Sequence, residues 1–222
     1  MFRYPASPLN TYSYFVGANP PTSFNPYSYF PTIDRTAFLS PFTFIVGNVT
    51  IRRQTFIGPF VSIRADEGIP FYIGKESNLQ DAVIIHGLKD EHYQVKGKKY
   101  SVFIGDKVTC AHGSLINGPA VIEDHVFVGF NAIVFNAWVE KGVYISAGAT
   151  VTNGVKLRAN SFVPPNASID SQEKADSLSP VPKNAADFAK EVQRVNSEFP
   201  PAYSLYLGKK KCSCGVAYGD GT

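Results

Sequence analysis

The stretch IDRTAF-LSPFTF-IVGNVT-IRRQTF-IGPFVS, residues 33–62, begins every group of six residues with Ile or Leu. An α-helix brings residues to one face with a period of about 3.6, and a strand does so with a period of about two. Neither element explains a period of six. A short repeat that continues over a long stretch is typical of a solenoid, in which each repeat packs on its neighbours.

The period continues far beyond this stretch. It pauses after Ile63 and after Ile85, and it contains one shorter step, to Val139. The repeated positions are Ile33, Leu39, Ile45, Ile51, Ile57, Ile63, Ile73, Leu79, Ile85, Ile104, Cys110, Ile116, Ile122, Val128, Val134, Val139, Ile145, Val151, Leu157, Val163 and Ile169. We predict an all-β solenoid: a parallel β-helix of hexapeptide repeats, shaped as a triangular prism of about seven coils. An ordinary β-sandwich would need period-two alternation and hairpin turns, which are scarce here.

The composition is that of a globular protein. The 222 residues are 44% hydrophobic and 18% charged, and the formal net charge of +3 gives no strong argument for a nucleic-acid partner. The first residues lack the apolar core of a signal peptide, and no apolar run is long enough to span a membrane. Three Cys are too few for a disulfide framework. We expect a soluble, cytoplasmic protein.

The chain divides into four predicted segments. Residues 1–32, rich in Pro and aromatic residues, form an extended arm that packs on the solenoid or on a neighbouring subunit and is a candidate surface for a protein partner. Residues 33–169 form the β-helix, and Cys110 fills a core position in it. Residues 170–208 form a helical segment that packs on the prism, and residues 209–222 a flexible tail.

Within the helical segment, Asp170 or Ser171 is expected to cap a short turn. A helix is then predicted from about Ala185 to Phe199, with one apolar face, and Pro200-Pro201 is expected to end it. In the tail, the spacing of Cys212 and Cys214 is weak evidence for a metal site.

Counting hexads places several polar residues relative to one another. Arg64, His86 and Asn117 each follow the third aliphatic residue of a coil, so they are predicted to stack along one edge of the prism. Gln80 follows the second aliphatic residue of its coil, and His112 lies on a different part of the prism. His112 therefore meets His86 only if neighbouring prisms pack side by side around a threefold axis.

Several motifs in this order resemble the gamma-class carbonic anhydrases, a family that includes archaeal enzymes and the N-terminal domain of the carboxysome protein CcmM. The motifs are Ser62-Ile-Arg-Ala-Asp-Glu-Gly68, Asn78-Leu-Gln-Asp81, His86-Gly87, Ala111-His112 and Asn117-Gly-Pro119. The resemblance extends over about residues 33–200. It implies a left-handed β-helix, a homotrimer with active sites at subunit interfaces, and metal-dependent, reversible hydration of carbon dioxide to bicarbonate.

The resemblance also implies a metal site. The family holds its metal with three His; two of these match His86 and His112, whereas the third matches Asn117. The family metal would be zinc, or iron or cobalt. An amide oxygen is a poor zinc ligand and suits harder cations better. Three alternatives therefore remain open: weak binding at all three residues, binding through the two His and waters, or an empty site.

Supporting residues of the family site match more fully. By resemblance, Glu67 is the proton-handling carboxylate, and Gln80 hydrogen-bonds the water or bicarbonate, with Asn78 as its neighbour in the motif. Arg64 and Asp66 match a pair that links subunits near the site.

Two further positions are less regular. Asn196 in the predicted helix matches a substrate-contacting Asn. Lys89 stands where the archaeal enzyme has an acidic proton shuttle, and Asp90, Glu91 or His92 is a candidate substitute.

Two functions from different classes follow. The first is a carbonic anhydrase. The second is a catalytically weak or inactive structural trimer that keeps the body of the family, in which the Asn at position 117 abolishes metal chemistry. In that second reading His86 and His112 are ordinary edge residues, and the acidic loop is a subunit salt-bridge cluster. A hexapeptide acyltransferase is disfavoured, because those enzymes need neither the acidic loop nor paired interface His residues.

Overall fold

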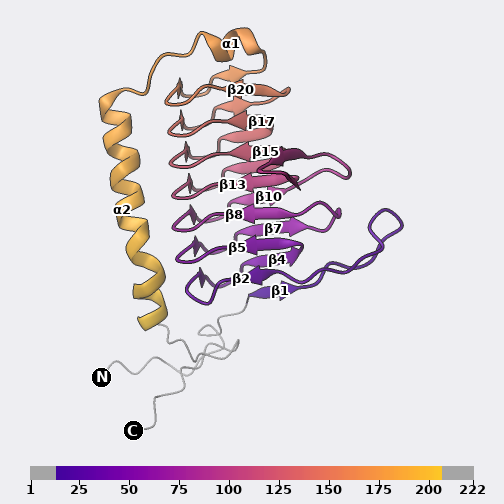
Figure 1. The fold of residues 1–222 in the computed structure, drawn as a ribbon. Helices are drawn as coiled ribbons and strands as arrows, with labels where there is room; N and C mark the ends of the chain where they lie inside the picture. The colour runs from indigo at the N-terminus through magenta and orange to yellow at the C-terminus, as the bar shows by residue number, and fades with distance from the viewer. Residues whose placement is uncertain (1–13, 207–222) are drawn as a thin grey trace.

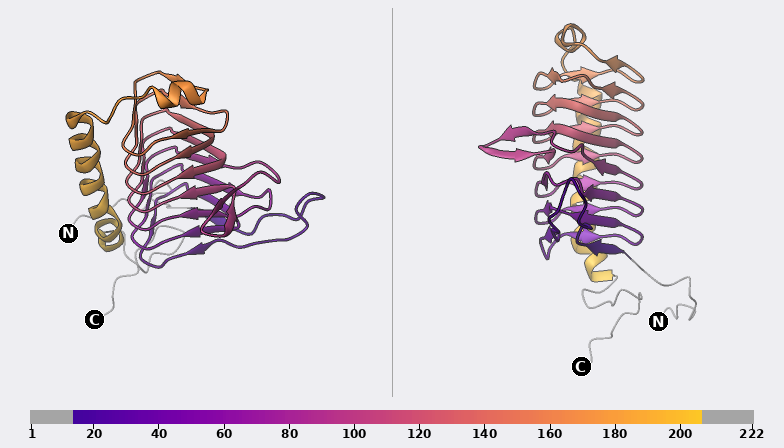
Figure 2. Two further views of the ribbon diagram at one scale, coloured as in Figure 1. Left: turned by 45° about the horizontal axis from the view of Figure 1, so that its top comes forward. Right: turned by 90° about the vertical axis from the view of Figure 1, so that its right-hand side faces the viewer.

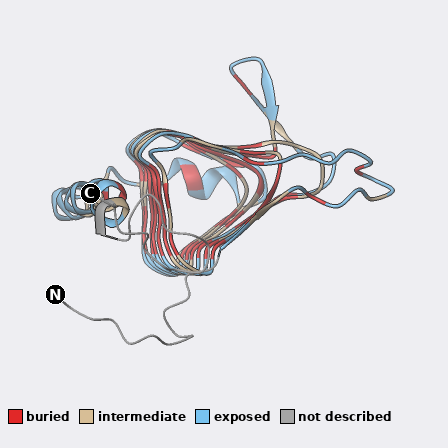
Figure 3. Cartoon of the chain, turned by 90° about the horizontal axis from the view of Figure 1, so that it is seen from below, coloured by how far each residue is buried: buried red, intermediate tan, exposed pale blue. Residues whose placement is uncertain are grey.

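The computed structural model describes residues 14–206 and shows a parallel β-helix with a triangular cross-section (Figures 1 and 3). Its coils stack along one axis, and a long helix lies along one of the three faces. The predicted fold class, a left-handed parallel β-helix with a C-terminal helix, is confirmed. The stack has about 8 turns, where the hexad count predicted about seven.

Two faces of the prism belong to one 13-stranded sheet. The first face contains β1 (Phe15–Gly17), β4 (Phe44–Gly47), β7 (Ser62–Ala65), β10 (Ile84–His86), β19 (Thr150–Val151) and β22 (Ser168–Ile169). The second contains β2 (Thr32–Ile33), β5 (Val49–Ile51), β8 (Phe71–Ile73), β13 (Val102–Ile104) and β20 (Val155–Leu157). Two long strands, β15 (Leu115–Ile122) and β17 (Ile133–Val139), pair on both faces.

The third face is a separate 7-stranded sheet. Its strands are β3 (Phe38–Leu39), β6 (Phe56–Ile57), β9 (Asn78–Leu79), β14 (Thr109–Cys110), β16 (Phe127–Val128), β18 (Tyr144–Ile145) and β21 (Phe162–Val163). All pairings on the three faces are parallel, as stacked coils of a solenoid require.

The aliphatic residues at hexad positions fill the interior. Ile63, Ile85, Ile116 and Val134 are paired in register on successive strands, and each is fully buried. Cys110 occupies the corresponding place on the third face and is also fully buried; this burial raises the pKa of its thiol to about 12. Burial of these apolar columns is the main favourable contribution to folding, because removing apolar surface from water is the largest stabilising term in a folded protein.

Corners between faces require backbone with positive φ. Asn is the residue that tolerates this conformation best after Gly, and Asn131, Asn160 and Asn166 have φ values of 53°, 58° and 56°. Gly148 occupies a corner with φ +69°, directly beside the Oδ1 atom of Asn166, which leaves no room for a Cβ atom. Asn and Gly adopt these turns with little strain, whereas other corners hold larger residues such as Phe60 (φ 60°) and Lys107 (φ 55°) in the same conformation.

The short helix α1 (Gln172–Asp176) follows the last coil. Of the two expected caps, Ser171 is the N-cap residue, and its side chain accepts a hydrogen bond from the backbone N–H of Lys174 (3.4 Å). Ala175 of this helix is fully buried against the core, so α1 covers the upper end of the prism (Figure 1).

The long helix α2 (Lys183–Tyr206) lies on the third face. The predicted end at Phe199 is wrong, because the helix continues through Pro200 and Pro201. The Phe199 ring packs on Phe56 (centroids 5.3 Å apart) and the Tyr203 ring on Phe38 (5.2 Å). These contacts on both sides of the prolines hold the last turns against the sheet, although each Pro removes a backbone donor.

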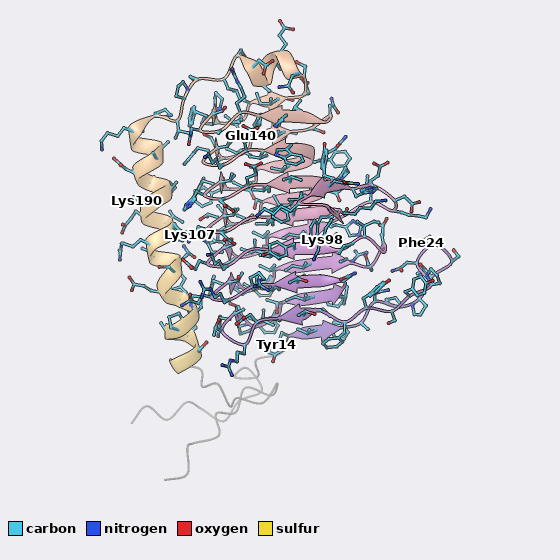
Figure 4. All side chains as sticks on the ribbon, viewed as in Figure 1. Tyr14, Phe24, Lys98, Lys107, Glu140 and Lys190 are labelled. Carbon is cyan, nitrogen blue, oxygen red and sulfur yellow. The ribbon has the colours of Figure 1, made fainter. Side chains whose placement is uncertain are left out.

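Part of the predicted arm belongs to the prism. Strand β1 pairs with β4, and the Phe15 ring stacks on Phe44 (4.9 Å), so this strand adds a turn before the first hexad. The following loop projects from the edge between the first and second faces, with Phe24 at its outer end (Figures 3 and 4). The Nδ2 atom of Asn25 in this loop donates to the carbonyl oxygen of Asp66 (2.9 Å).

The longer insertion after β10 forms an antiparallel hairpin, β11 (Tyr93–Val95) and β12 (Lys98–Tyr100), which stands out from the prism (Figure 2). Residues 1–13 of the arm and 207–222, including Cys212 and Cys214, lie outside the described residues. None of the helices within residues 14–206 is long and apolar enough to cross a membrane.

Candidate functional site

The predicted stack of polar residues lies at the edge between the first and second faces. His86 and Asn117 are register partners on β10 and β15, and Arg64 follows Ile63, the partner of Ile85. Each of the three residues comes directly after a buried Ile that anchors its strand in the core. The hexad repeat therefore positions these side chains one strand spacing apart.

Two carboxylates of the loop after β7 surround His86. Its Nε2 atom lies 3.4 Å from Asp66 Oδ1 and 3.4 Å from Glu67 Oε1. These contacts lack hydrogen-bond geometry. Arg64 donates from Nε to the other oxygen of Asp66 (3.0 Å), which fixes that carboxylate at the edge.

Glu67 is held by the next coil. Its Oε2 atom accepts a hydrogen bond from the backbone N–H of Lys89 (2.6 Å), while Oε1 faces His86. The Lys89 side chain turns to Asp90 instead (Nζ to Oδ2, 2.6 Å). The sequence match drew attention to the Lys89 side chain; its contribution to the site is a backbone donor, which residue type alone does not reveal.

The edge contains buried polar atoms that could hold a cation. His86 Nε2, Asn117 Oδ1 and Asp66 Oδ1 are buried and have no hydrogen-bond partner within residues 14–206. A buried polar atom without a partner is costly, and such atoms commonly mark a functional site. An imidazole nitrogen and an amide oxygen both offer lone pairs, and adjacent carboxylates stabilise positive charge. The donor set therefore fits a divalent cation, with two of the three expected protein ligands in one chain.

The remaining predicted residues gather elsewhere, in a groove of about 560 Å³ between α2 and the prism. Gln80, His112 and Asn196 line this groove, together with aromatic and aliphatic side chains. Asn78 is buried beside it and accepts at Oδ1 from Gln80 Nε2 (3.3 Å).

His112 stands at the corner between the third and first faces. Its ring stacks on Phe130 (5.7 Å), and its Nδ1 atom lies 3.7 Å from Asp81 Oδ1. The side chain is about half exposed, at 54%. It is therefore available to a neighbouring molecule, while the ring contact limits its orientation.

One chain thus carries two separate groups of predicted residues. The edge group is Arg64, Asp66, Glu67, His86 and Asn117; the groove group is Asn78, Gln80, His112 and Asn196. Across the described part of a single chain, no group of three or more His, Cys, Asp or Glu is arranged to hold a metal ion.

Sequence reasoning missed one contributor to the groove group. Gln193 of α2 accepts hydrogen bonds from Asn78 Nδ2 (3.1 Å) and from the Thr109 hydroxyl (3.4 Å). It lies directly after Val192, beside the apolar face of the helix, where a polar residue is easily taken as solvent-facing. Only the partners across the helix–sheet contact reveal its role.

No family model matches the chain. Over 88% of its length it is 39% identical to the carboxysome assembly protein CcmM of Nostoc sp., of which it spans only 35%. Over 77% of its length it is 35% identical to the carbonic anhydrase of Methanosarcina thermophila and covers 72% of that protein. Gamma carbonic anhydrase 1 of Arabidopsis thaliana mitochondria is 30% identical over 57% of the chain and 45% of that protein.

Among solved structures, an acetyltransferase-like protein of Bacillus cereus superposes with a TM-score of 0.67, covering 80% of this chain and 94% of that one. Its sequence identity is 20%, so the likeness shows the fold alone.

Proposed function

The chain belongs to the gamma-class carbonic anhydrase family, and we propose that it catalyses the reversible hydration of carbon dioxide to bicarbonate. One structural observation carries the proposal. His86 Nε2 and Asn117 Oδ1, on paired residues of adjacent strands, are buried without hydrogen-bond partners in the described chain, beside two carboxylates. Polar atoms kept unpaired in this way suit a cation-binding reaction centre.

The proposed cation is zinc, iron or cobalt, held by His86, Asn117 and the His112 of a second copy. When bound, a divalent cation supplies Lewis-acid chemistry and, in zinc enzymes of this reaction, lowers the pKa of a water to about 7. Asn117 replaces an imidazole with a weaker amide oxygen ligand, so we expect looser metal retention than three His would give.

Residues of the chain carry the proton and substrate steps. Glu67 is placed to accept a proton at Oε1, while the backbone N–H of Lys89 fixes its other oxygen. The Arg64–Asp66 pair keeps the edge ordered. Gln80 and Asn196 provide amide groups that orient the substrate in a groove lined mostly by apolar side chains, which limit the access of bulk water.

The active assembly is proposed to be a homotrimer. The edge group and the groove group lie on different corners of one prism, so each site is completed when the edge of one copy meets the groove of the next. Exposed apolar residues on the first face support this contact: Phe44 is 41% and Ile84 47% exposed. The predicted cytoplasmic location, a partner for the arm and the individual site roles stay predictions.

A second function, a structural trimer with weak or no catalysis, has one residue in its favour. Asn117 stands at a position where metal binding calls for a stronger ligand. The relatives named as carboxysome assembly proteins are compatible with such a role. In this case the trimer contacts persist, while the edge group no longer binds a metal.

Metal content and carbon dioxide hydration separate the two functions. The full chain is purified anaerobically, its metal is counted, and hydration is measured with zinc, iron or cobalt added. The enzyme proposal predicts bound metal and metal-dependent hydration. A trimer with neither metal nor hydration under all of these conditions would refute catalysis and support the structural alternative.

A further inference from the structure

A continuous chain of hydrogen bonds connects α2 to Gln80. Gln193 donates from Nε2 to the carbonyl oxygen of Glu76 (2.6 Å), and its Oε1 accepts from Asn78 Nδ2 (3.1 Å). Asn78 Oδ1 in turn accepts from Gln80 Nε2 (3.3 Å). The Thr109 hydroxyl lies inside this chain; it accepts from Asn78 Nδ2 (2.9 Å) and is within 3.4 Å of Gln193 Oε1.

The direction of this chain is fixed at one end. A backbone carbonyl such as that of Glu76 has no proton to donate, so the side-chain group facing it must be the NH₂ of Gln193. The oxygen of Gln193 then faces Asn78, whose NH₂ must point to it and whose oxygen must point to Gln80. Each amide therefore determines the orientation of the next one.

Burial makes a reversed orientation costly. Asn78, Thr109 and Gln80 are only 1%, 2% and 6% exposed. If one amide turned over, two oxygens or two NH₂ groups would face each other away from water, and each would lose its partner. The bond to Glu76 thus sets the orientation of all three amides.

We propose that Gln193 is a positioning residue for Gln80, and that it directs the Gln80 carbonyl oxygen toward the groove. This inference rests on the proposed function, since it concerns how Gln80 meets the substrate. An oxygen facing the groove accepts a hydrogen bond, so the site favours a substrate or product that carries an O–H group. Bicarbonate has such a group, whereas fully deprotonated carbonate does not.

The orientation can be tested without relying on turnover. In the full-length protein, the side-chain NH₂ signals of Gln80 are assigned by NMR through their disappearance in Gln80→Ala. In Gln193→Leu, which keeps the size of the side chain but loses both bonds, these signals are expected to shift and to exchange faster with water. The Gln193→Leu change should also lower kcat/KM by about tenfold, because a buried amide loses its fixed partner.

A double-mutant cycle separates positioning from general damage. If Gln193 acts through Gln80, adding Gln193→Leu to Gln80→Ala lowers kcat/KM by less than about twofold. The control is Val163→Ala, which shortens a fully buried core side chain on β21, four strands away from β9 along the third face. It is expected to lower the Tm but to leave the Gln80 signals unchanged.

The inference is overturned if Gln193→Leu leaves the Gln80 signals in place, or if its rate loss adds fully to that of Gln80→Ala. It is also overturned if Val163→Ala shifts those signals as much as Gln193→Leu does. Should the wild-type protein show no hydration, the proposed function fails, and the NMR comparison alone decides the orientation of Gln80.

Discussion

His86 and Asn117 are paired residues of β10 and β15, and the buried Nε2 of the first and Oδ1 of the second have no hydrogen-bond partner within the described residues. Adjacent strands in a sheet are about 4.8 Å apart, so the two side chains leave the same edge as neighbours. Asp66 and Glu67 each place an oxygen 3.4 Å from His86 Nε2. This edge combines lone pairs and negative charge, which is the condition for cation binding.

Replacing Asn117 by His tests the ligand role of this edge. An imidazole nitrogen binds zinc more strongly than an amide oxygen, so Asn117→His is expected to retain metal through dialysis against a chelator concentration that strips the wild type. We expect the metal content per chain to rise and the hydration rate to increase by about tenfold or more. Asn184→His, on the exposed first turn of α2, is the control and should change neither quantity.

If Asn117→His gains no metal while the protein remains folded, the edge is not a metal site. A wild type that already retains a full complement of metal would show instead that the Asn117 amide is a sufficient ligand.

Glu67→Gln tests the proton step. The amide keeps the size of the side chain and still accepts from the Lys89 N–H, but it no longer takes up a proton at the atom facing His86. General acid–base groups contribute roughly 10²- to 10⁴-fold, so kcat is expected to fall by about 100-fold or more. A small buffer base such as imidazole should restore part of the rate.

The matched control is Glu198→Gln, a charge change on exposed α2 that should leave kcat within about twofold of the wild type. Equal losses of kcat in Glu67→Gln and Glu198→Gln would rule out a proton-transfer role for Glu67.

Two Gly residues with similar left-handed backbone test what a Cβ atom costs at a corner of the coil. Gly148 (φ +69°) and Gly97 (φ +77°) both require left-handed backbone, but only at Gly148 does a new Cβ meet another atom, the Oδ1 of Asn166. Gly148→Ala therefore combines backbone strain with a clash, and Gly97→Ala has the strain alone. We expect a Tm for Gly148→Ala that is about 2–4 °C below that of Gly97→Ala. Equal values would mean that Asn166 moves aside freely.

Cys110 is expected to be unreactive in the folded protein. Burial raises the pKa of its thiol from an ordinary value of 9.0 to about 12, so the thiol stays protonated through pH 7–9. Only the thiolate reacts with iodoacetamide, and reagent access is also blocked. Mass spectrometry should find the Cys110 peptide unlabelled in native protein from pH 7 to 9 and labelled in urea. Native labelling that accelerates between pH 8 and 9 would contradict the buried position.

The hexad repeat was sufficient to predict the prism and the edge. Ile63, Ile85 and Ile116 pair in register, so the residues that follow them stack as counted from the sequence. This worked because the side-chain direction in a strand depends only on position in the repeat. The orientation of His112 away from that edge followed from the same count.

Features outside the repeat were not predictable in this way. Strand β1 lacks a hexad and is placed by the contact of Phe15 with Phe44. Helix α2 passes two Pro residues because Phe199 and Tyr203 pack on the sheet, and tertiary contacts of this kind override local preference. The link from Gln193 to Gln80 joins residues far apart in the sequence, so no local pattern indicates it.

Mixing two inactive variants tests most directly whether the hydration site is shared between copies. His86→Ala removes the imidazole of the edge group, and His112→Ala removes the imidazole of the groove group. Each variant alone should therefore hydrate carbon dioxide no faster than the metal-containing buffer. After the two are unfolded and refolded together in equal amounts, roughly a quarter of the sites in random trimers join an intact edge to an intact groove. We predict that the mixture recovers about a quarter of the wild-type rate. A mixture as inactive as the separate variants, from a wild type that is active, would contradict the shared site.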